Sequence, residues 1–309
     1  MKKGTFLSSD NSTEVVYYIF EPKNIKPKAV VQISHGMQDH ISRYGDLIKF
    51  LNERGFVVCG NDDLGHGETS KNPDTDGFFA KKLGAECVLN DLHTMSLIAK
   101  NKYPNLPYFL IGHSMGSFFA RYFAYTFPED LDGLILLGTS GRVSGTSAGI
   151  VLLSVIQAIR GGKYKSKLFE NIMLKSYFKY INNVKSKREW VTSDNKKLKE
   201  YESDSRCAFM FTTSAYKDML RVLKFVNTKK WAKGINKKLS ILIASGAKDP
   251  VGNYGKGVCE VYSMLENNEI KDIQLKLYSQ ARHELHNEKP KIKQEFLQDV
   301  ANWLYDRCR

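Results

Sequence analysis

Short runs of β-branched and aromatic residues, each closed by turn residues, recur along the first half of the chain. Helical spacing of apolar residues fills the intervals between the later runs, and two further runs come near the end. Runs that are apolar at nearly every position and alternate with helices are typical of a mostly parallel sheet covered on both faces. The predicted strands are residues 15–20, 29–34, 56–61, 108–112, 133–137, 239–244 and 273–277, and the predicted helices are residues 41–54, 84–102, 115–127 and 291–305.

The alternation of strands and helices stops in the middle of the chain. After an entry segment Ser-Gly-Arg-Val-Ser-Gly, basic, aromatic and apolar residues mix in helical patterns up to about residue 228. An irregular helical block between two halves of one α/β pattern indicates an insertion and not an independent domain. We therefore expect an α/β core formed by residues 1–140 and 229–309, and an inserted helical cap formed by residues 141–228.

Positive charge is concentrated in the predicted cap. The chain of 309 residues has 46 Lys/Arg and 33 Asp/Glu, and residues 141–226 alone hold 17 of the former and 7 of the latter. Such a basic surface has three possible interpretations: it binds nucleic acid, it contacts an anionic membrane, or it is simply solvated. No nucleic-acid-binding motif accompanies the charge, so we expect no nucleic acid partner. A solvated surface is the simplest interpretation, and an anionic lipid surface becomes attractive if the chemistry concerns lipids.

Composition restricts the class of protein further. Hydrophobic residues make up 42% of the chain, which is enough to form a sizeable core. The longest nearly uncharged apolar stretch, residues 147–159, is shorter than a membrane span, and the first residues carry two lysines without the apolar segment of a signal peptide. The five cysteines are scattered, form no Cys-x-x-Cys pair and join no histidine cluster typical of a metal site. We expect a cytoplasmic protein without a metal.

A serine stands in the pattern Gly-x-Ser-x-Gly at residues 112–116, between a predicted strand and a predicted helix. In that context the pattern marks a nucleophile, because a very tight strand-to-helix turn exposes the serine hydroxyl. Glycines two residues away on either side let such a turn close without a clash. The sequence therefore predicts Ser114 as a nucleophile.

An activated serine needs a general base, and the base needs an acid that orients it. On a scaffold with a serine in this turn, the order along the chain is serine, acid, histidine. Asp249 follows the predicted strand 239–244, and His283 follows the predicted strand 273–277. Both therefore lie at carboxyl ends of strands, where open α/β sheets place their active sites. We predict Asp249 as the acid and His283 as the base, with His286, further from the strand end, as the rival base.

A developing oxyanion needs two backbone N–H donors that point to one place. The amide of Met115 is suited to be one donor, because it lies at the start of a helix. The loop His35-Gly36-Met37 follows another predicted strand and is expected to supply the second donor from Met37. His35 itself is more simply interpreted as a buried histidine bonded to the loop backbone than as a catalytic group.

Together these motifs resemble the monoacylglycerol lipase/lysophospholipase branch of the α/β-hydrolase superfamily, a group also called serine aminopeptidase S33 or Hydrolase-4. The resembling segments are His35-Gly36-Met37 with His40 and Arg43-Tyr44, Asn61-Asp62 with Gly65-His66-Gly67, Gly112 to Gly116, Gly246 with Asp249-Pro250, and His283-Glu284 with Asn287-Glu288. Within the predicted cap, Trp190 to Asp194 and Tyr201 to Asp204 look like a further segment of the family. One departure is Asp63, where relatives often carry histidine.

The resemblance implies the α/β-hydrolase fold and cleavage of carboxylic esters of fatty acids, without a cofactor, through an acyl-enzyme on Ser114. It places Ser114, Asp249 and His283 in the triad, and the amides of Met37 and Met115 in the oxyanion hole. The apolar helix near residues 150–156 is expected to line a pocket for the acyl chain or to touch a bilayer, which would make the protein peripherally membrane-associated. The residues expected to contact this small lipid or ester substrate are His35, Gly36, His113, Ile150, Leu153 and Trp190.

Other functions remain open beside this one. A short-chain carboxylesterase would use the same machinery. An aminopeptidase that releases N-terminal proline would need acids to hold the substrate ammonium, for which Glu200, Glu202 and Asp204 are candidates, but the basic excess around them opposes it. A non-catalytic binding protein is disfavoured because nucleophile, acid and base are all intact. The sequence leaves the oligomeric state and the headgroup preference open.

Overall fold

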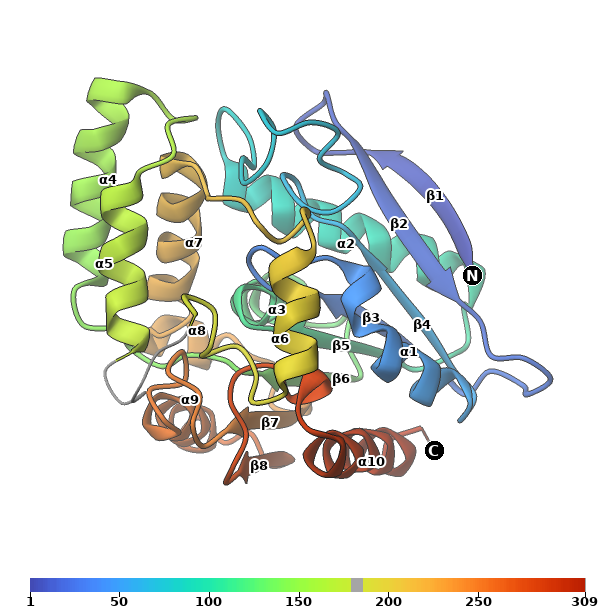
Figure 1. Cartoon of the computed structure of the whole chain (residues 1–309). Helices are drawn as coiled ribbons and strands as arrows, with labels where there is room; N and C mark the ends of the chain where they lie inside the picture. The colour runs from blue at the N-terminus through green and yellow to red at the C-terminus, as the bar shows by residue number, and fades with distance from the viewer. Residues whose placement is uncertain (179–185, 309) are drawn as a thin grey trace.

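The structure is a computed structural model, and it describes residues 1–178 and 186–308. The described residues form an eight-stranded sheet in the order β1-β2-β4-β3-β5-β6-β7-β8 (Figure 1). The strands are β1 (Lys2–Leu7), β2 (Glu14–Phe20), β3 (Ala29–Ser34), β4 (Phe56–Asn61), β5 (Tyr108–His113), β6 (Gly133–Leu137), β7 (Ser240–Gly246) and β8 (Ile273–Tyr278). The pairs from β4/β3 through β7/β8 are parallel, whereas β2 pairs antiparallel with both β1 and β4. The predicted mostly parallel α/β sheet is confirmed.

The sheet is buried on both faces because its central strands are apolar at nearly every position. In β3, Val30 packs into one apolar cluster and the next residue, Val31, packs into the other, since successive side chains point to opposite faces. The helices α1 (Gly45–Asn52) and α10 (Pro290–Asp306) supply one cluster, and α2 (Gly84–Lys102), α3 (Met115–Thr126) and α9 (Lys256–Glu266) supply the other. The predicted helix 41–54 begins as a 3-10 turn, Ile41–Tyr44, before α1.

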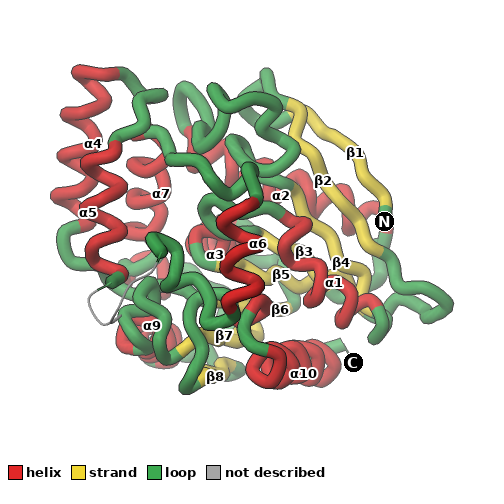
Figure 2. Tube along the Cα trace, viewed as in Figure 1, coloured by secondary structure: helices red, strands yellow, loops and turns green. Residues whose placement is uncertain are grey.

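The described residues between β6 and β7 are mostly helical, and we call residues 141–228 the insertion. It contains α4 (Thr146–Arg160), α5 (Lys167–Tyr177), α6 (Asn195–Ser203) and α7 (Thr213–Phe225), and α8 (Lys229–Lys233) follows. Ser166, Asp194 and Thr212 begin three of these helices by accepting a backbone N–H with their side chains. Figure 2 shows α4, α5 and α7 grouped beside the sheet and α6 apart from them. Residues 179–185 of the predicted cap lie outside the described residues, and its boundaries stay a prediction.

The length and hydropathy of the described helices can be compared with those of a membrane span. Across residues 1–178 and 186–308, no helix combines the length and the apolar character that a membrane span requires.

Candidate active site

Ser114 lies at the junction of β5 and α3, on a backbone conformation that few residues adopt. Its φ is 52° and its ψ is −120°. A Cβ on Gly116 would lie 2.1 Å from the carbonyl oxygen of Ser34, and a Cβ on Gly112 would lie 2.5 Å from the carbonyl oxygen of Gly116. Only glycine at these two positions therefore lets the turn close against β3. Such a strained strand-to-helix turn is the setting in which a serine hydroxyl is presented to substrate.

His283 and Asp249 form a buried pair at the ends of β8 and β7. Nδ1 of His283 lies 2.9 Å from Oδ2 of Asp249, and the two side chains are 3% and 0% exposed. The backbone N–H of Val251 donates to Oδ1 of Asp249 at 2.9 Å. Burial opposes a charge on the imidazole, but the carboxylate of Asp249, helped by those of Glu284 and Asp39, outweighs it and raises the pKa of His283 above its ordinary value of 6.5. Since Nδ1 donates to the carboxylate, Nε2 is the atom left to accept a proton.

The residues that adjoin Ser114, in sequence and in space, lie close to the ring of His283. The backbone N–H of Ser114 donates to the carbonyl of Leu137, the last residue of β6, at 2.9 Å. Gly138 follows, and a Cβ there would lie only 2.9 Å from the His283 ring. The ring centroid of His113 is 4.8 Å from that of His283. The predicted nucleophile, acid and base thus come to one edge of the sheet from β5, β7 and β8.

The loop after β3 runs directly past the predicted nucleophile. A Cβ on Gly36 would lie 3.3 Å from Cβ of Ser114, so the loop backbone approaches the serine closely. Met37 is the next residue and is half-buried. Met115 starts α3, and the first amides of a helix have no acceptor within it. The two predicted oxyanion donors therefore belong to the backbone segments that flank Ser114.

His35 and His113, both predicted to contact substrate, are bonded to neighbouring groups. Nδ1 of His35 lies 2.8 Å from the carbonyl oxygen of Gly36, and its Nε2 accepts the backbone N–H of Asp63 at 3.0 Å. Nδ1 of His113 lies 2.8 Å from the hydroxyl of Tyr44. Both rings are buried. Their placement suits residues that hold the loops beside the nucleophile, and their contact with substrate stays a prediction.

Asp39 is the centre of a buried polar network to which the sequence analysis gave no role. Its Oδ2 accepts the hydroxyl of Tyr44 at 2.7 Å, and its Oδ1 accepts from Arg43 at 2.9 Å. Arg43 continues to Glu284, the residue after the predicted base. Burial disfavours a charge on Asp39, but Arg43, His113 and His35 together outweigh it and hold the pKa of Asp39 well below its usual range. The network connects the loop after β3 with the loop that carries His283.

One segment of the insertion is hydrogen-bonded to the loop of His283. The backbone N–H of Glu284 donates to the carbonyl of Val191 at 2.8 Å. The neighbouring Trp190 is 5% exposed, and its ring lies 5.1 Å from that of His283. The structure therefore places Trp190, one of the predicted substrate contacts, beside the predicted base.

The two predicted pocket residues of α4 differ in their surroundings. Leu153 is fully buried and belongs to the same apolar cluster as Met115, whereas Ile150 is half-buried. Phe169 and Tyr216, whose rings are 5.0 Å apart, join this cluster from α5 and α7. Apolar side chains of the insertion thus continue the apolar cluster that reaches the site.

The sequence matches the family model described as "Serine aminopeptidase, S33" (Hydrolase_4) over residues 25–290, which is most of the chain. The chain belongs to the Hydrolase_4 family. Relatives of this Hydrolase_4 chain agree with the fold seen here. A solved structure of a highly thermostable carboxyl esterase from Bacillus coagulans, in complex with glycerol, has a TM-score of 0.94 and 30% identity, covering 100% of this chain and 99% of that chain.

Two further relatives carry lipase names. The monoglyceride lipase of Rattus norvegicus is 27% identical over 282 residues, which cover 91% of this chain and 84% of the relative. A soluble variant of monoglyceride lipase from Saccharomyces cerevisiae, solved with a substrate analog, has a TM-score of 0.78 over 99% of this chain and 94% of that chain; at 18% identity it bears on the fold alone. The resemblance and the fold class predicted from sequence are confirmed, and this Hydrolase_4 member is a hydrolytic enzyme of the monoglyceride lipase-like kind.

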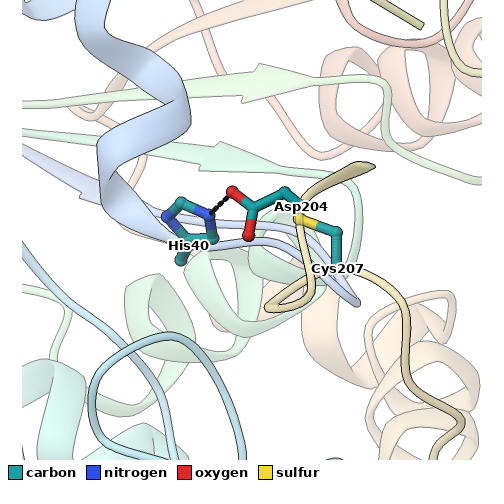
Figure 3. Close-up of side chains that lie close together, drawn as sticks. All are labelled: His40, Asp204 and Cys207. Carbon is teal, nitrogen blue, oxygen red and sulfur yellow. Dashed lines mark hydrogen bonds and ion pairs between the residues drawn. The ribbon is translucent and has the colours of Figure 1, made fainter. Parts of the chain in front are cut away.

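One group of side chains in the described part of this Hydrolase_4 chain has the spacing of metal ligands. The ligand atoms of His40, Asp204 and Cys207 all lie within 4.8 Å of one another (Figure 3). The carboxylate of Asp204 already has a cationic partner, because Arg206 donates to both of its oxygens, at 3.1 and 2.9 Å. The positive charge of Arg206 would repel a metal ion at this place. Burial also raises the pKa of the Cys207 thiol, which disfavours the thiolate that a metal needs. We assign the group to the contact between the insertion and the loop after β3.

Proposed function

We propose that this Hydrolase_4 member cleaves carboxylic esters of fatty acids, of the monoacylglycerol or lysophospholipid type, through an acyl-enzyme on Ser114. The observation that carries the proposal is the buried pair of His283 and Asp249, 2.9 Å apart, beside a serine on a strained strand-to-helix turn. An imidazole held by a carboxylate is the arrangement that turns a neighbouring serine hydroxyl into a nucleophile.

The reaction follows from the roles of these groups. Oγ of Ser114 attacks the ester carbonyl carbon while Nε2 of His283 takes the hydroxyl proton. The carbonyl oxygen becomes an oxyanion, which the amides of Met37 and Met115 stabilise. When the carbon–oxygen bond to the alcohol breaks, His283 returns the proton to the leaving oxygen, and the acyl group stays on the serine. Water then attacks in the same way and releases the carboxylic acid.

The relatives and the apolar cluster support a glycerol ester of a fatty acid as substrate. The rat relative is named a monoglyceride lipase, and the structure of the Bacillus coagulans esterase holds glycerol. A fatty acyl chain needs apolar surroundings, which Leu153 and Phe169 supply in the cluster that includes Met115. The indole N–H of Trp190 is buried and has no acceptor among the described residues, so it is available to an oxygen of the substrate.

A short-chain carboxylesterase is the second candidate, because the Bacillus coagulans relative carries that name and shares the whole fold. An aminopeptidase is disfavoured because two of the three acids that would hold an ammonium group are already paired with cations. Asp204 is bonded to Arg206, and Glu200 is bonded to Lys197 at 3.0 Å. Neither carboxylate is left with the negative potential that a substrate cation requires.

We further propose that α4 and α5 touch an anionic membrane surface from which the substrate is drawn. Five of their apolar side chains are more than half exposed: Val151 (63%), Val155 (52%), Ile159 (75%), Leu168 (61%) and Ile172 (53%). The three members on α4 are four residues apart and therefore share one face. Arg160 and Lys167 are exposed near them, and the whole insertion has a positive excess. An apolar stripe flanked by cations suits the interface of an anionic bilayer.

Vesicle sedimentation tests this contact. The double variant Val155→Ser/Ile159→Ser is expected to lose binding to vesicles of phosphatidylglycerol and phosphatidylcholine. Leu7→Ser is the control, since Leu7 is 63% exposed, between Val155 and Ile159 in exposure, but lies on β1. Raising the salt from about 0.05 M to about 0.5 M is expected to weaken binding of the wild type, because salt screens the attraction of the cations. Binding that ignores both changes would contradict the membrane contact.

The hydrolytic proposal is tested by the acids that the protein releases. A monoacylglycerol, neutral and anionic lysophospholipids, a short acetate ester and a prolyl anilide are incubated with wild type and with Ser114→Ala, and the released acid or amine is measured by mass spectrometry. Long-chain acid that appears only with wild type is the expected result. Turnover of acetate alone would favour the short-chain esterase, and release of proline would overturn both ester candidates.

A further inference from the structure

The helix α6 lies in front of the sheet in the view of Figure 1. Both of its flanks are hydrogen-bonded to loops of the core that follow strands of the sheet. Residues 189–193, before α6, contact the loop of His283, as described above. Residues 204–209, after α6, contact the loop after β3, which carries Met37. A single short helix therefore joins the two loops on which the proposed reaction depends.

Two bonds connect the second flank of α6 with the loop after β3. Nε2 of His40 lies 2.9 Å from Oδ2 of Asp204 (Figure 3), and the side-chain amide of Gln38 donates to the backbone carbonyl of Phe209. His40 and Gln38 are each 1% exposed. Gln38 has a φ of 56°, a conformation that a glutamine adopts only where its surroundings enforce it. The shape of this loop thus depends on partners in the insertion.

A carboxylate within the loop also fixes its shape. Asp39, between Gln38 and His40, accepts the backbone N–H of Gly36 at 3.3 Å and that of His40 at 2.8 Å. The loop is therefore closed on itself by Asp39 and bonded to the insertion through Asp204. Burial disfavours a charge on Asp204, but its hydrogen bonds from Arg206 and His40 outweigh it and lower its pKa, so that it stays ionised at neutral pH.

We propose that Asp204 is a positioning residue for catalysis: through His40 it holds the loop of Met37 in the shape that directs an amide to the oxyanion. The inference rests on the proposed ester hydrolysis and adds a role for the insertion in the chemical step. Displacement of residues 204–209 would release His40 and Gln38 together, and with them the loop beside Ser114. The insertion then contributes to the geometry of the proposed oxyanion site through Asp204.

Loss of a positioning residue has a kinetic signature that loss of substrate binding lacks. Oxyanion donors act on the transition state and little on the bound ester, so their misplacement lowers kcat and leaves KM nearly unchanged. Removal of a donor outright costs about 10²–10³ in kcat. Asp204 acts through His40, and other bonds still hold the loop, so we expect Asp204→Asn to lower kcat by about tenfold. A trifluoromethyl ketone inhibitor forms an oxyanion that uses the same donors, so its affinity is expected to weaken by a similar factor.

The experiment uses a soluble short-chain nitrophenyl ester, so that membrane contact plays no part. Asp204→Asn, His40→Gln and the double variant are compared with wild type, and Glu200→Gln is the matched control. Glu200 lies in α6, is paired on the surface with Lys197, and is expected to tolerate the same change of charge without a kinetic effect. If Asp204 acts through His40, the double variant is no slower than the slower single variant, because the two changes break one bond.

Each result decides the matter. A loss in kcat and in ketone affinity that is shared by the two single variants supports the inference. Unchanged kcat in Asp204→Asn, a change confined to KM, or multiplication of the two effects in the double variant would overturn it while the proposed hydrolysis stands. If wild type neither hydrolyses any ester nor reacts with a fluorophosphonate at Ser114, the proposed function fails and the role of Asp204 fails with it. Circular dichroism confirms that each variant is folded, and if Asp204→Asn does not fold, kcat and ketone affinity of His40→Gln decide alone.

Discussion

Arg43 and Glu284 form a buried ion pair with two hydrogen bonds, of 2.7 and 2.6 Å, between the loop after β3 and the loop that carries His283. Their side chains are 10% and 4% exposed. A planar guanidinium bonded to both oxygens of a carboxylate fixes distance and orientation together. The pair therefore sets how the segment with the proposed oxyanion amide lies relative to the proposed base.

Glu284→Gln is expected to lower the free energy of unfolding by about 3 kcal/mol, because the buried guanidinium of Arg43 loses one of its two carboxylate partners. Urea denaturation measures the change. Glu200→Gln removes a carboxylate that is 50% exposed and paired with Lys197, and it is expected to change stability by less than about 1 kcal/mol. Equal losses in the two variants would show that the pair of Arg43 and Glu284 contributes no more than a surface pair.

Gly138→Ala tests whether the space beside the His283 ring is needed for catalysis. Gly138 has a φ of 54°, so alanine there costs about 1 kcal/mol of backbone strain, and the new Cβ would lie 2.9 Å from the imidazole. Displacement of the base is expected to lower kcat by about 10²-fold. Gly145→Ala is the matched control, since Gly145 has a φ of 86° but open space around it. Similar losses of kcat in both variants would assign the effect to strain and not to the base.

The strands were predicted well because burial on both faces leaves a plain signature in the sequence. The predicted ranges 29–34, 56–61 and 133–137 coincide with β3, β4 and β6. The edge strand β1 was not predicted, because its residues Lys2–Leu7 pair with a single neighbour and are mostly exposed or half-buried. An edge strand that contributes little to the core carries little hydrophobic pattern.

The predicted triad residues come to one edge because each follows a strand of the same parallel sheet, and because β5, β6, β7 and β8 are neighbours in that sheet. The network of Asp39, Arg43 and Glu284 could not be predicted in the same way. Asp39 and Arg43 are close in sequence, but nothing local indicates that Glu284 completes their pairing. Charged residues in loops are usually solvated, and only the packing of these two loops shows that Asp39 and Glu284 are buried. The contact of His40 with Asp204 was missed for the same reason.

The pH dependence of activity is expected to follow His283. Because the carboxylate of Asp249, with those of Glu284 and Asp39, outweighs burial, the pKa of His283 is raised above 6.5, and the imidazole becomes an unprotonated base only above that raised value. The rate of ester cleavage should therefore fall on the acid side at a higher pH than an ordinary histidine would give. A profile of kcat/KM against pH on a soluble ester measures the midpoint. A midpoint below 6.5 would contradict the placement of Asp249 as its partner.

His286 is expected to make the folded protein sensitive to acid. Its ring stacks on Tyr44 with centroids 4.4 Å apart, and neither ring nitrogen has a hydrogen-bond partner among the described residues. Burial, with His113 alongside, lowers the pKa of His286 to about 3. Between pH 6.5 and about 3 the unfolded chain therefore binds a proton at this position that the folded chain does not bind, and stability falls as the pH falls.

The size of this effect is about 1.4 kcal/mol for each pH unit within that range. Other groups add to the acid sensitivity of wild type, so the comparison with His286→Phe isolates the one residue. The phenyl ring retains the stacking on Tyr44 and cannot be protonated. The dependence of the unfolding free energy on pH between about 6 and 4, measured by urea denaturation, should be shallower in the variant by about 1.4 kcal/mol per pH unit. Parallel curves for the two proteins would mean that His286 is protonated as readily in the folded state as in the unfolded chain.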